Sequence, residues 1–230
     1  MRTVLVTGAD RGIGHALCRA CHARGDTVVA ACLGESDELR ALGIQVEPGI
    51  DVTSEDAVRG LAESLARTGT TLDILINNAG IAGPDHVLGA LDYDDIRRQV
   101  EVNALGPLRV TEALLERLKP GSTVAFITSR IGSLGDNHSG GLYGYRISKC
   151  AVNMVAVNLA HDLATRGIGA VVLHPGMVAT AMTFDDERAE ARPPEEAAAA
   201  LIERIERAGQ TEPGTPPAFW HAPERTTIPW

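Results

Sequence analysis

The 230-residue sequence lacks the features that mark membrane, secreted and nucleic-acid-binding proteins. No apolar run reaches the roughly 18 residues that a helix needs to span a bilayer. No signal peptide precedes the first apolar segment. The formal net charge of −9 repels a phosphate backbone. We therefore expect a soluble, cytoplasmic protein with neither a membrane segment nor a nucleic-acid partner.

Cysteine is scarce, and its four positions suggest neither a disulfide framework nor a metal site. Cys18 and Cys21 have the spacing of redox and metal-binding pairs, but they fall within a helical pattern, and no second Cys or His pair supports them. We expect buried thiols instead. The seven histidines are scattered without metal-ligand spacing, so we predict no catalytic metal.

Apolar strand-like segments alternate with helical patterns along the whole chain. The expected strands cover residues 3–7, 27–32, 45–50, 72–76, 123–128 and 170–173, with 219–220 as a last short edge strand. The expected helices cover residues 13–24, 38–42, 54–67, 92–118, 143–166 and 193–207, with a kink at 106–107. Strands that are apolar on both faces and alternate with helices predict one α/β domain over residues 1–230. Its doubly wound parallel sheet carries helices on both faces.

A glycine-rich turn joins the first strand to the first helix and reads Thr7-Gly8-Ala9-Asp10-Arg11-Gly12-Ile13-Gly14. Glycine allows a tight turn and the close approach of a pyrophosphate, which a helix N-terminus binds through unpaired N–H groups. The spacing Gly-x-x-x-Gly-x-Gly differs from the usual Gly-x-Gly-x-x-Gly, so a merely structural turn is the alternative. The flanking strand and helix favour dinucleotide binding, as in a Rossmann domain.

Tyr145 and Lys149 stand at i and i+4, on one face of an expected helix. The chain has only two lysines and three tyrosines, which makes a chance pair at this spacing improbable. A nearby ammonium favours the phenolate and lowers the tyrosine pKa toward working pH. Such a tyrosine can donate a proton to a carbonyl oxygen as a hydride reaches the carbon. The alternative is an ordinary pair on the helix surface.

Together these motifs resemble the short-chain dehydrogenase/reductase family over residues 3 to about 182. The segments that carry the resemblance are Thr7 to Gly14, Asn77-Asn78-Ala79-Gly80, Val102-Asn103-Ala104, Thr128-Ser129-Arg130-Ile131-Gly132, Tyr145-x-x-x-Lys149 and Pro175-Gly176-Met177-Val178-Ala179-Thr180. Gly132-Ser133, residues 140–146 and the final Ile228-Pro229-Trp230 are most similar to the C-factor-like or sniffer-like carbonyl reductases of that family.

The resemblance implies a role for each matched residue. Tyr145 would be the acid and base, Lys149 would lower its pKa and bind the nicotinamide ribose, Ser129 would bind the substrate oxygen, and Asn103 would help to hold a water. The implied cofactor-binding residues are Gly8, Asp10, Arg11, Gly12, Ile13, Gly14, Cys32, Leu33, Asp51, Val52, Asn78, Ala79, Gly80, Tyr145, Lys149, Pro175, Gly176, Val178 and Thr180.

Two departures from the family pattern bear on the substrate site. The segment from Ser129 to Tyr145 is longer than is common, which makes Ser133 a rival for the serine role; Ser129 is favoured because it follows the strand directly. The substrate-covering segment, about residues 181–194, is short and predicts an open pocket. We expect a carbonyl or alcohol substrate. Non-redox chemistry such as epimerisation or dehydration, and a non-catalytic NAD(P)-binding sensor, are the alternatives.

The end of the second strand bears on the choice of cofactor. NAD-specific relatives carry an acid there, which hydrogen-bonds the ribose hydroxyls and repels a 2′-phosphate. Here Cys32 takes that place, and Arg11 can reach a 2′-phosphate. Leu33 stands where many NADP-dependent relatives carry a second arginine, and Glu35 lies close by. We therefore favour NADP(H) over NAD(H), with dual use open. The family further implies a homodimer or homotetramer through its two long central helices.

Overall fold

The computed structural model describes residues 1–183, 188–208 and 215–230, and within them eight strands form one sheet in the order β3-β2-β1-β4-β5-β6-β7-β8. The strands are β1 (Thr3–Thr7), β2 (Thr27–Ala31), β3 (Gln45–Glu47), β4 (Leu72–Asn77), β5 (Leu118–Ile127), β6 (Gly169–His174), β7 (Phe219–His221) and β8 (Thr226–Thr227). All neighbouring strands are parallel except β7 and β8, which are antiparallel. The predicted α/β class and doubly wound parallel sheet are confirmed.

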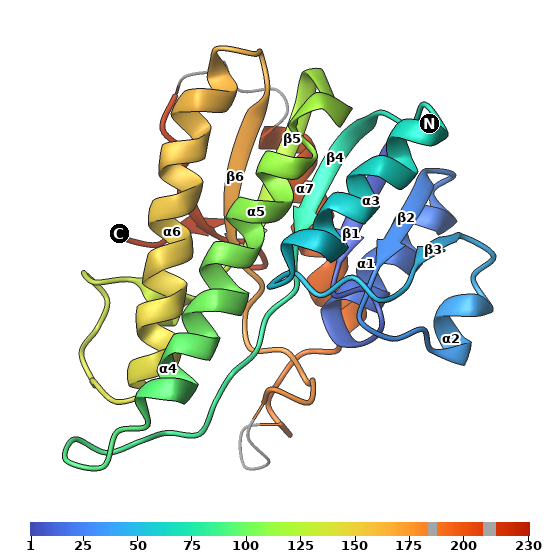
Figure 1. The fold of residues 1–230 in the computed structure, drawn as a ribbon. Helices are drawn as coiled ribbons and strands as arrows, with labels where there is room; N and C mark the ends of the chain where they lie inside the picture. Colours follow the sequence, from blue (N-terminus) through green and yellow to red (C-terminus); the bar gives the residue numbers. More distant parts are fainter. Residues whose placement is uncertain (184–187, 209–214) are drawn as a thin grey trace.

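Helices cover both faces of the sheet (Figure 1). They are α1 (Gly12–Ala23), α2 (Asp37–Arg40), α3 (Glu55–Arg67), α4 (Tyr93–Val100), α5 (Gly106–Ala113), α6 (Tyr143–Ala164) and α7 (Pro194–Ala208). One apolar core joins the sheet to α1 and α7, and a second joins it to α3, α5 and α6.

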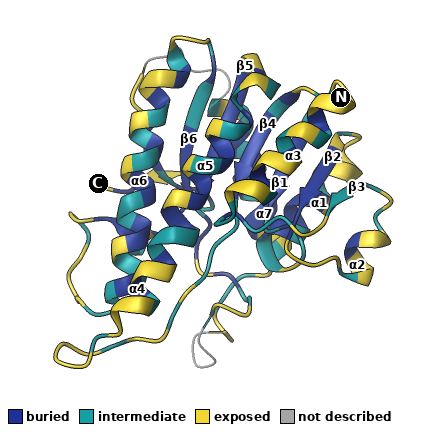
Figure 2. Cartoon of the chain, viewed as in Figure 1, coloured by how far each residue is buried: buried dark blue, intermediate teal, exposed yellow. Residues whose placement is uncertain are grey.

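The two cores follow from the strand geometry, because successive side chains of a strand point to opposite faces. In β1, Val4 and Val6 enter the first core, whereas Leu5 enters the second. The strands are therefore buried on both faces, and the helices expose only their outer faces (Figure 2). Local signals also act as expected: the hydroxyl of Ser54 caps α3 by accepting a hydrogen bond from the N–H of Ala57.

The helix predicted over residues 92–118, with a kink at 106–107, is interrupted directly before that kink and ends earlier than predicted. α4 passes into a π-helical turn, Glu101–Leu105, before α5 begins, and β5 already starts at Leu118. Pro107 lies in the first turn of α5, where its missing N–H removes a bond that a continuous helix would need. The interruption therefore falls just before the proline. Asn103 lies in the π-helical turn.

Other predicted boundaries also need correction. β2 ends at Ala31 and β3 at Glu47, so both strands are shorter than expected. β7 is not an edge strand, because it pairs with β6 on one side and with β8 on the other. In the described part of the chain, no helix combines the length and apolar character needed to cross a membrane. The same residues contain no cluster of three or more His, Cys, Asp or Glu side chains suited to a metal ion.

Candidate active site

A cleft of about 810 Å³ opens along the edge of the sheet where the parallel strands end. Sixteen of the predicted cofactor residues line it: Gly8, Asp10, Arg11, Gly12, Ile13, Gly14, Leu33, Asp51, Val52, Asn78, Ala79, Gly80, Tyr145, Lys149, Pro175 and Thr180. Three others, Cys32, Gly176 and Val178, do not line its wall. Carboxyl ends of parallel strands are the usual ligand edge of such sheets.

The glycine turn is built around close backbone contacts. A Cβ on Gly14 would lie 2.0 Å from the carbonyl oxygen of Gly8, and a Cβ on Gly8 would lie 2.8 Å from the Cα of Ala79. Gly8 and Gly12 also have φ values of 63° and 54°, which glycine adopts without strain. The sequence therefore has glycine at these positions because no side chain fits there.

The start of α1 fits a pyrophosphate. Its N-cap residue, Arg11, makes no side-chain capping bond, and its first turn contains no acidic residue. The first N–H groups of a helix have no partner within the helix, and they attract phosphate oxygens. Because this end of α1 lines the cleft, the residues present fit the diphosphate of a dinucleotide.

Asn78 and Thr7 tie the end of β4 to the glycine turn. The Thr7 hydroxyl accepts hydrogen bonds from the backbone N–H groups of Asn78, at 3.0 Å, and of Ala79, at 3.1 Å. The side-chain amide of Asn78 donates to the carbonyl oxygens of Thr7 and Gly8, at 2.9 and 3.2 Å. These four bonds hold the two sides of the cleft at one fixed separation.

Tyr145 lines the cleft, and Ser129, which lies beside it, is not among the lining residues. A side-chain hydrogen bond joins them, and it lowers the pKa of Tyr145. Burial acts more strongly in the opposite direction, so that the pKa of the phenol is raised to about 12. The predicted net lowering of the Tyr145 pKa is therefore not found in this structure, because burial outweighs the hydrogen bond. The phenol is therefore a protonated donor at neutral pH.

Lys149 lies one helical turn after Tyr145 and is buried. Its Nζ donates a hydrogen bond to the carbonyl oxygen of Ile127 at 3.2 Å and lies 5.6 Å from the centre of the Tyr145 ring. Burial lowers the pKa of this ammonium from 10.5 to about 8. Gly132 allows this packing, because a Cβ there would come within 2.7 Å of the Lys149 backbone.

The side chain of Asn103 forms hydrogen bonds with the backbone that follows β4. Its Oδ1 accepts from the N–H of Ile81 at 2.8 Å, and its Nδ2 donates to the carbonyl oxygen of Ile81 at 2.8 Å and to the hydroxyl of Ser148 at 2.9 Å. Ile81 lines the cleft, whereas Asn103 does not. The side chain thus fixes one wall of the cleft and links it to α6.

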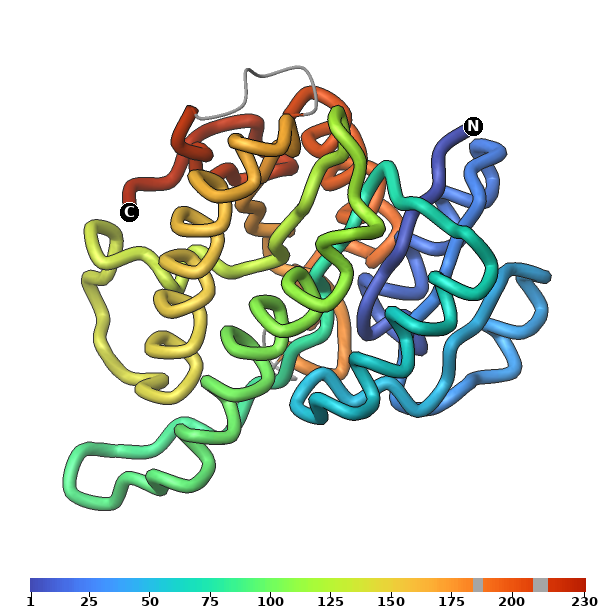
Figure 3. The backbone as a smooth tube through the Cα atoms, turned by 45° about the horizontal axis from the view of Figure 1, so that its top comes forward, coloured from blue at the N-terminus to red at the C-terminus, as the bar shows by residue number. Residues whose placement is uncertain are grey.

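Ser133, the other candidate for the catalytic serine, contacts the C-terminal segment. Its hydroxyl donates to the carbonyl oxygen of Pro229 and accepts from the N–H of Asp136 at 3.0 Å. The N–H of Gly135 donates to the carbonyl oxygen of Trp230 at 2.8 Å, so the last residues run along the turn after β5 (Figure 3). The ring of Trp230 stacks on Phe219. Ser133 anchors this segment and makes no contact with Tyr145.

The adenosine end of the cleft combines Leu33 with Arg11. The side chain of Leu33 is 66% exposed, whereas Cys32 is buried, and burial raises the pKa of its thiol to about 11. Arg11 is largely exposed and lies 3.9 Å from Asp10. Glu35 is held by Arg40 in an ion pair of 2.9 Å. The carboxylate of Glu35 is therefore already paired with a cation.

Sequence reasoning missed several cleft residues, because each is defined by its place beside a motif rather than by its type. Val102, Thr128 and Ala179 stand in the segments that carry the family resemblance, and Ala181, Met182, Arg188 and Pro194 stand in the predicted cover. The residues missed altogether are Ile50, Thr53, Ile81, Ala82, Arg98, Glu101 and Ile127. Most directly precede or follow a predicted segment, and that adjacency was the available signal. Part of the predicted cover, residues 184–187, lies outside the described residues.

Comparison with known proteins agrees with this geometry. The sequence matches the short chain dehydrogenase family over residues 2–191. It is 50% identical over 232 residues to 1-hydroxy-2-glutathionyl-2-methyl-3-butene dehydrogenase of Rhodococcus sp. (strain AD45), covering 100% of both chains. The fold is similar to carbonyl reductase Sniffer of D. melanogaster (TM-score 0.89, 25% identity). It is also similar to a short-chain dehydrogenase/reductase from Burkholderia multivorans with bound NADP (TM-score 0.88, 29% identity). Both structural matches cover 100% of each chain.

Proposed function

Because the chain belongs to the short-chain dehydrogenase/reductase family and is an NAD(P)-dependent oxidoreductase, we propose that Tyr145 is its general acid and base in the interconversion of a carbonyl compound and an alcohol. The observation that carries this proposal is the hydrogen bond between Tyr145 and Ser129 beside the cleft, with Lys149 buried one turn away. This pairing supports the proposal that the two hydroxyls bind one substrate oxygen together.

In the reducing direction, a bound nicotinamide cofactor would supply the hydride for the carbonyl carbon. Ser129 donates a hydrogen bond to the carbonyl oxygen and holds it against Tyr145. Tyr145, whose pKa of about 12 keeps it protonated, donates its proton to that oxygen as negative charge develops there. In the oxidising direction Tyr145 takes the same proton back. Lys149 holds a positive charge beside the phenol, and that charge stabilises the phenolate left after transfer.

The preferred cofactor in this proposal is NADP(H). Buried Cys32 presents no carboxylate to the ribose, Glu35 is paired with Arg40, and exposed Arg11 can approach a 2′-phosphate. The similar Burkholderia protein binds NADP. Asp51 and Val52 would contact the adenine, and Thr180 the nicotinamide, because all three line the cleft.

The relative of 50% identity is named for an alcohol whose neighbouring carbon carries a glutathionyl thioether. We extend this substrate class to the present protein: an alcohol, or the corresponding carbonyl compound, beside the sulfur of a glutathione conjugate. This class is compatible with a Tyr–Ser pair, because the pair contacts only the reacting oxygen of a substrate.

The test is oxidation of S-(2-hydroxyethyl)glutathione, followed as absorbance of the reduced nicotinamide with NADP⁺ or NAD⁺. We expect turnover that is faster with NADP⁺ and faster than with 2-(methylthio)ethanol, which has the same hydroxyethyl thioether but no peptide. No cofactor reduction with either alcohol, and no cofactor oxidation with the matching aldehydes, would refute the redox proposal.

We also propose a homo-oligomer formed through α5 and α6. Exposed apolar side chains project from these helices and from the turn before α5: Leu105, Leu108, Ile147 and Met154. Val152, by contrast, faces the internal core. Light scattering of the wild type and of Met154→Glu would test the interface, since a charge in an apolar contact should lower the measured mass.

A further inference from the structure

Four basic side chains gather at the carboxyl ends of β5, β6 and β7, and we call them the Arg–His cluster: Arg130, His174, Arg192 and His221. His174 and His221 are paired across the last position of β6 and β7, and their rings meet edge to face at 4.7 Å. Arg130 follows Ser129 directly. Arg192 belongs to the segment after β6 that pairs back onto Val178.

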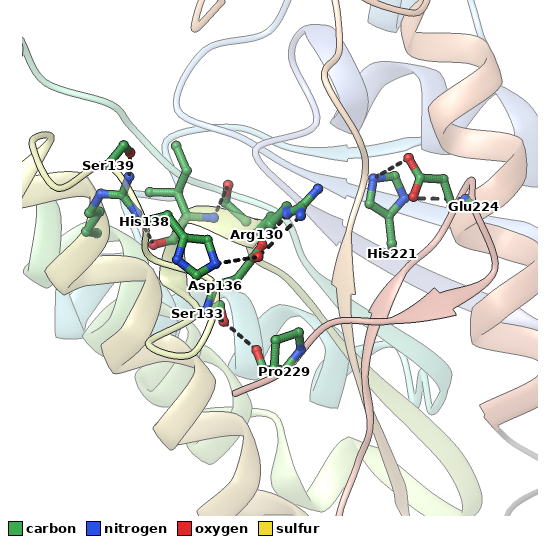
Figure 4. A network of polar contacts seen from close by, with 11 residues as sticks. Arg130, Ser133, Asp136, His138, Ser139, His221, Glu224 and Pro229 are labelled. Carbon is green, nitrogen blue, oxygen red and sulfur yellow. Dashed lines mark hydrogen bonds and ion pairs between the residues drawn. The ribbon is translucent and has the colours of Figure 1, made fainter.

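Two of the four side chains have acidic partners. Arg130 donates from Nε and Nη2 to the carboxylate of Asp136. His221 lies 3.2 Å from the carboxylate of Glu224. Figure 4 shows both pairs, with Arg130 lying between Asp136 and the side of the cluster that holds His221. These acids therefore compensate Arg130 and His221 and leave the other two members without a negative partner.

Arg192 has no such compensation. Its guanidinium packs against Gly176, where a Cβ would lie 2.8 Å from Nε, and no described side chain forms an ion pair with it. Its Nε is buried without a hydrogen-bond partner, and so is Nδ1 of His174. Burial, with a smaller contribution from the charges of His221, Arg130, Arg192 and Lys149, lowers the pKa of His174 to about 3, so His174 is neutral.

Buried polar atoms nearly always have a partner, and a guanidinium whose buried Nε lacks one, beside other basic groups, attracts an anion. Position ties this anion site to catalysis: Arg130 adjoins Ser129, and Gly176 adjoins Pro175, which lines the cleft. The planar fork of an arginine suits the two oxygens of a carboxylate.

We propose that Arg192, with His174 beside it, binds a carboxylate of the substrate and so selects anionic alcohols and carbonyl compounds, glutathione conjugates among them. This inference rests on the proposed function for its substrate class. The neutral ring of His174 donates or accepts a hydrogen bond next to the carboxylate, and Arg130 adds positive potential although Asp136 neutralises most of its charge.

The experiment measures binding separately from turnover. S-methylglutathione has the carboxylates but no hydroxyl to oxidise, and it is titrated calorimetrically into the NADP⁺-loaded protein. We expect Arg192→Gln to weaken its binding about 10- to 100-fold, which is the effect of losing a charged hydrogen bond. The affinity of Arg192→Lys for S-methylglutathione should lie between those of the wild type and Arg192→Gln. Arg166→Gln, which removes an exposed arginine paired with Glu116 at the opposite end of the sheet, should match the wild type.

A second ligand identifies the group that is recognised. The dimethyl ester of S-methylglutathione, without free carboxylates, should bind the wild type weakly and should not discriminate between wild type and Arg192→Gln. The anion site is refuted if the wild type fails to bind S-methylglutathione, if Arg192→Gln binds it within twofold of the wild type, or if the ester binds equally well. If binding depends on Arg192 but S-(2-hydroxyethyl)glutathione is never oxidised, the site stands and the proposed function fails.

Discussion

The hydroxyl of Ser133 donates a hydrogen bond to the carbonyl oxygen of Pro229, 96 positions further along the chain. The hydroxyl of Ser129 instead hydrogen-bonds Tyr145. The two serines that compete for one role in the sequence therefore make separate contacts, one with the C-terminal segment and one with the phenol.

Substitution should separate these two serines cleanly. Ser129→Ala removes a donor to the substrate oxygen and should lower kcat about 10²- to 10³-fold with little change in thermal stability. Ser133→Ala removes a bond to Pro229 and one from Asp136, and should lower the free energy of unfolding by about 1–3 kcal/mol while kcat stays within a few-fold. Steady-state kinetics and urea unfolding of both variants decide this, and the reverse ranking of kcat would assign the catalytic role to Ser133.

Tyr145→Phe should lower turnover by about 10²- to 10⁴-fold, because the proton donor is lost while the ring remains. NADPH affinity, measured by fluorescence titration, should stay close to that of the wild type. Tyr93→Phe is the matched control, since Tyr93 is 62% exposed and lies outside the cleft. Equal turnover in the two variants would be incompatible with Tyr145 as the acid and base.

Lys149 should make stability depend on pH in a predictable direction. Burial lowers its pKa from 10.5 to about 8, so the unfolded chain binds more protons than the folded one between these values. The contribution of Lys149 to the free energy of unfolding therefore rises with pH through this window. Urea unfolding of wild type and Lys149→Met at pH 7, 8, 9 and 10 should show a difference that shifts in favour of the wild type above about pH 8. A difference in the free energy of unfolding that does not change with pH would contradict this prediction. Lys119→Met, which changes an exposed lysine, is the control.

The sequence was sufficient for the order of elements, the family, the sniffer-like relatives and most of the cleft. Strands such as 3–7 are apolar on both faces, which identifies a covered parallel sheet, and the glycine spacing reflects contacts that exclude a Cβ. The predicted boundaries of helices and strands were wrong where tertiary contacts override the local hydrophobic pattern. Leu114 and Leu118 continue the apolar helical pattern, yet Leu118 pairs with Leu72 in the sheet.

The Arg–His cluster was beyond sequence analysis for a different reason. Its members come from the ends of three strands and from a segment that pairs with Val178 and packs Arg192 against Gly176. No spacing in the chain relates Arg192 to His174. The sequence also could not predict whether Cys32 lines the cleft or is buried in the core, because a thiol at a strand end is compatible with both positions.

Arg11→Gln should reduce kcat/KM with NADPH about tenfold and leave the NADH value within about twofold, because only NADPH offers a 2′-phosphate. Arg40→Gln should act in the same direction by releasing Glu35 from its ion pair, which leaves a carboxylate free to repel that phosphate. Both values are measured on one carbonyl substrate. An equal decrease in kcat/KM with the two cofactors would show that Arg11 does not bind the 2′-phosphate.

Gly14→Ala should destabilise the fold by about 1–3 kcal/mol and weaken cofactor binding, because the added methyl would lie 2.0 Å from the Gly8 carbonyl oxygen. Gly60→Ala is the matched control in α3. No neighbouring atom lies within 4 Å of its Cβ, so this change should stabilise the protein by about 0.5–1 kcal/mol. Thermal unfolding of both variants gives the comparison, and equal stability of the two would count against the packing argument.

The bonds from Asn78 and Ala79 to the hydroxyl of Thr7 also set an order of events during synthesis. The glycine turn is translated first, yet the groups that fix its shape lie 71 and 72 residues later, and β1 pairs with β4 across the same interval. A nascent chain that has not yet released β4 from the ribosome therefore lacks one wall of the dinucleotide cleft. Cofactor binding can assist folding only after that strand has emerged, because a ligand stabilises only the state that binds it.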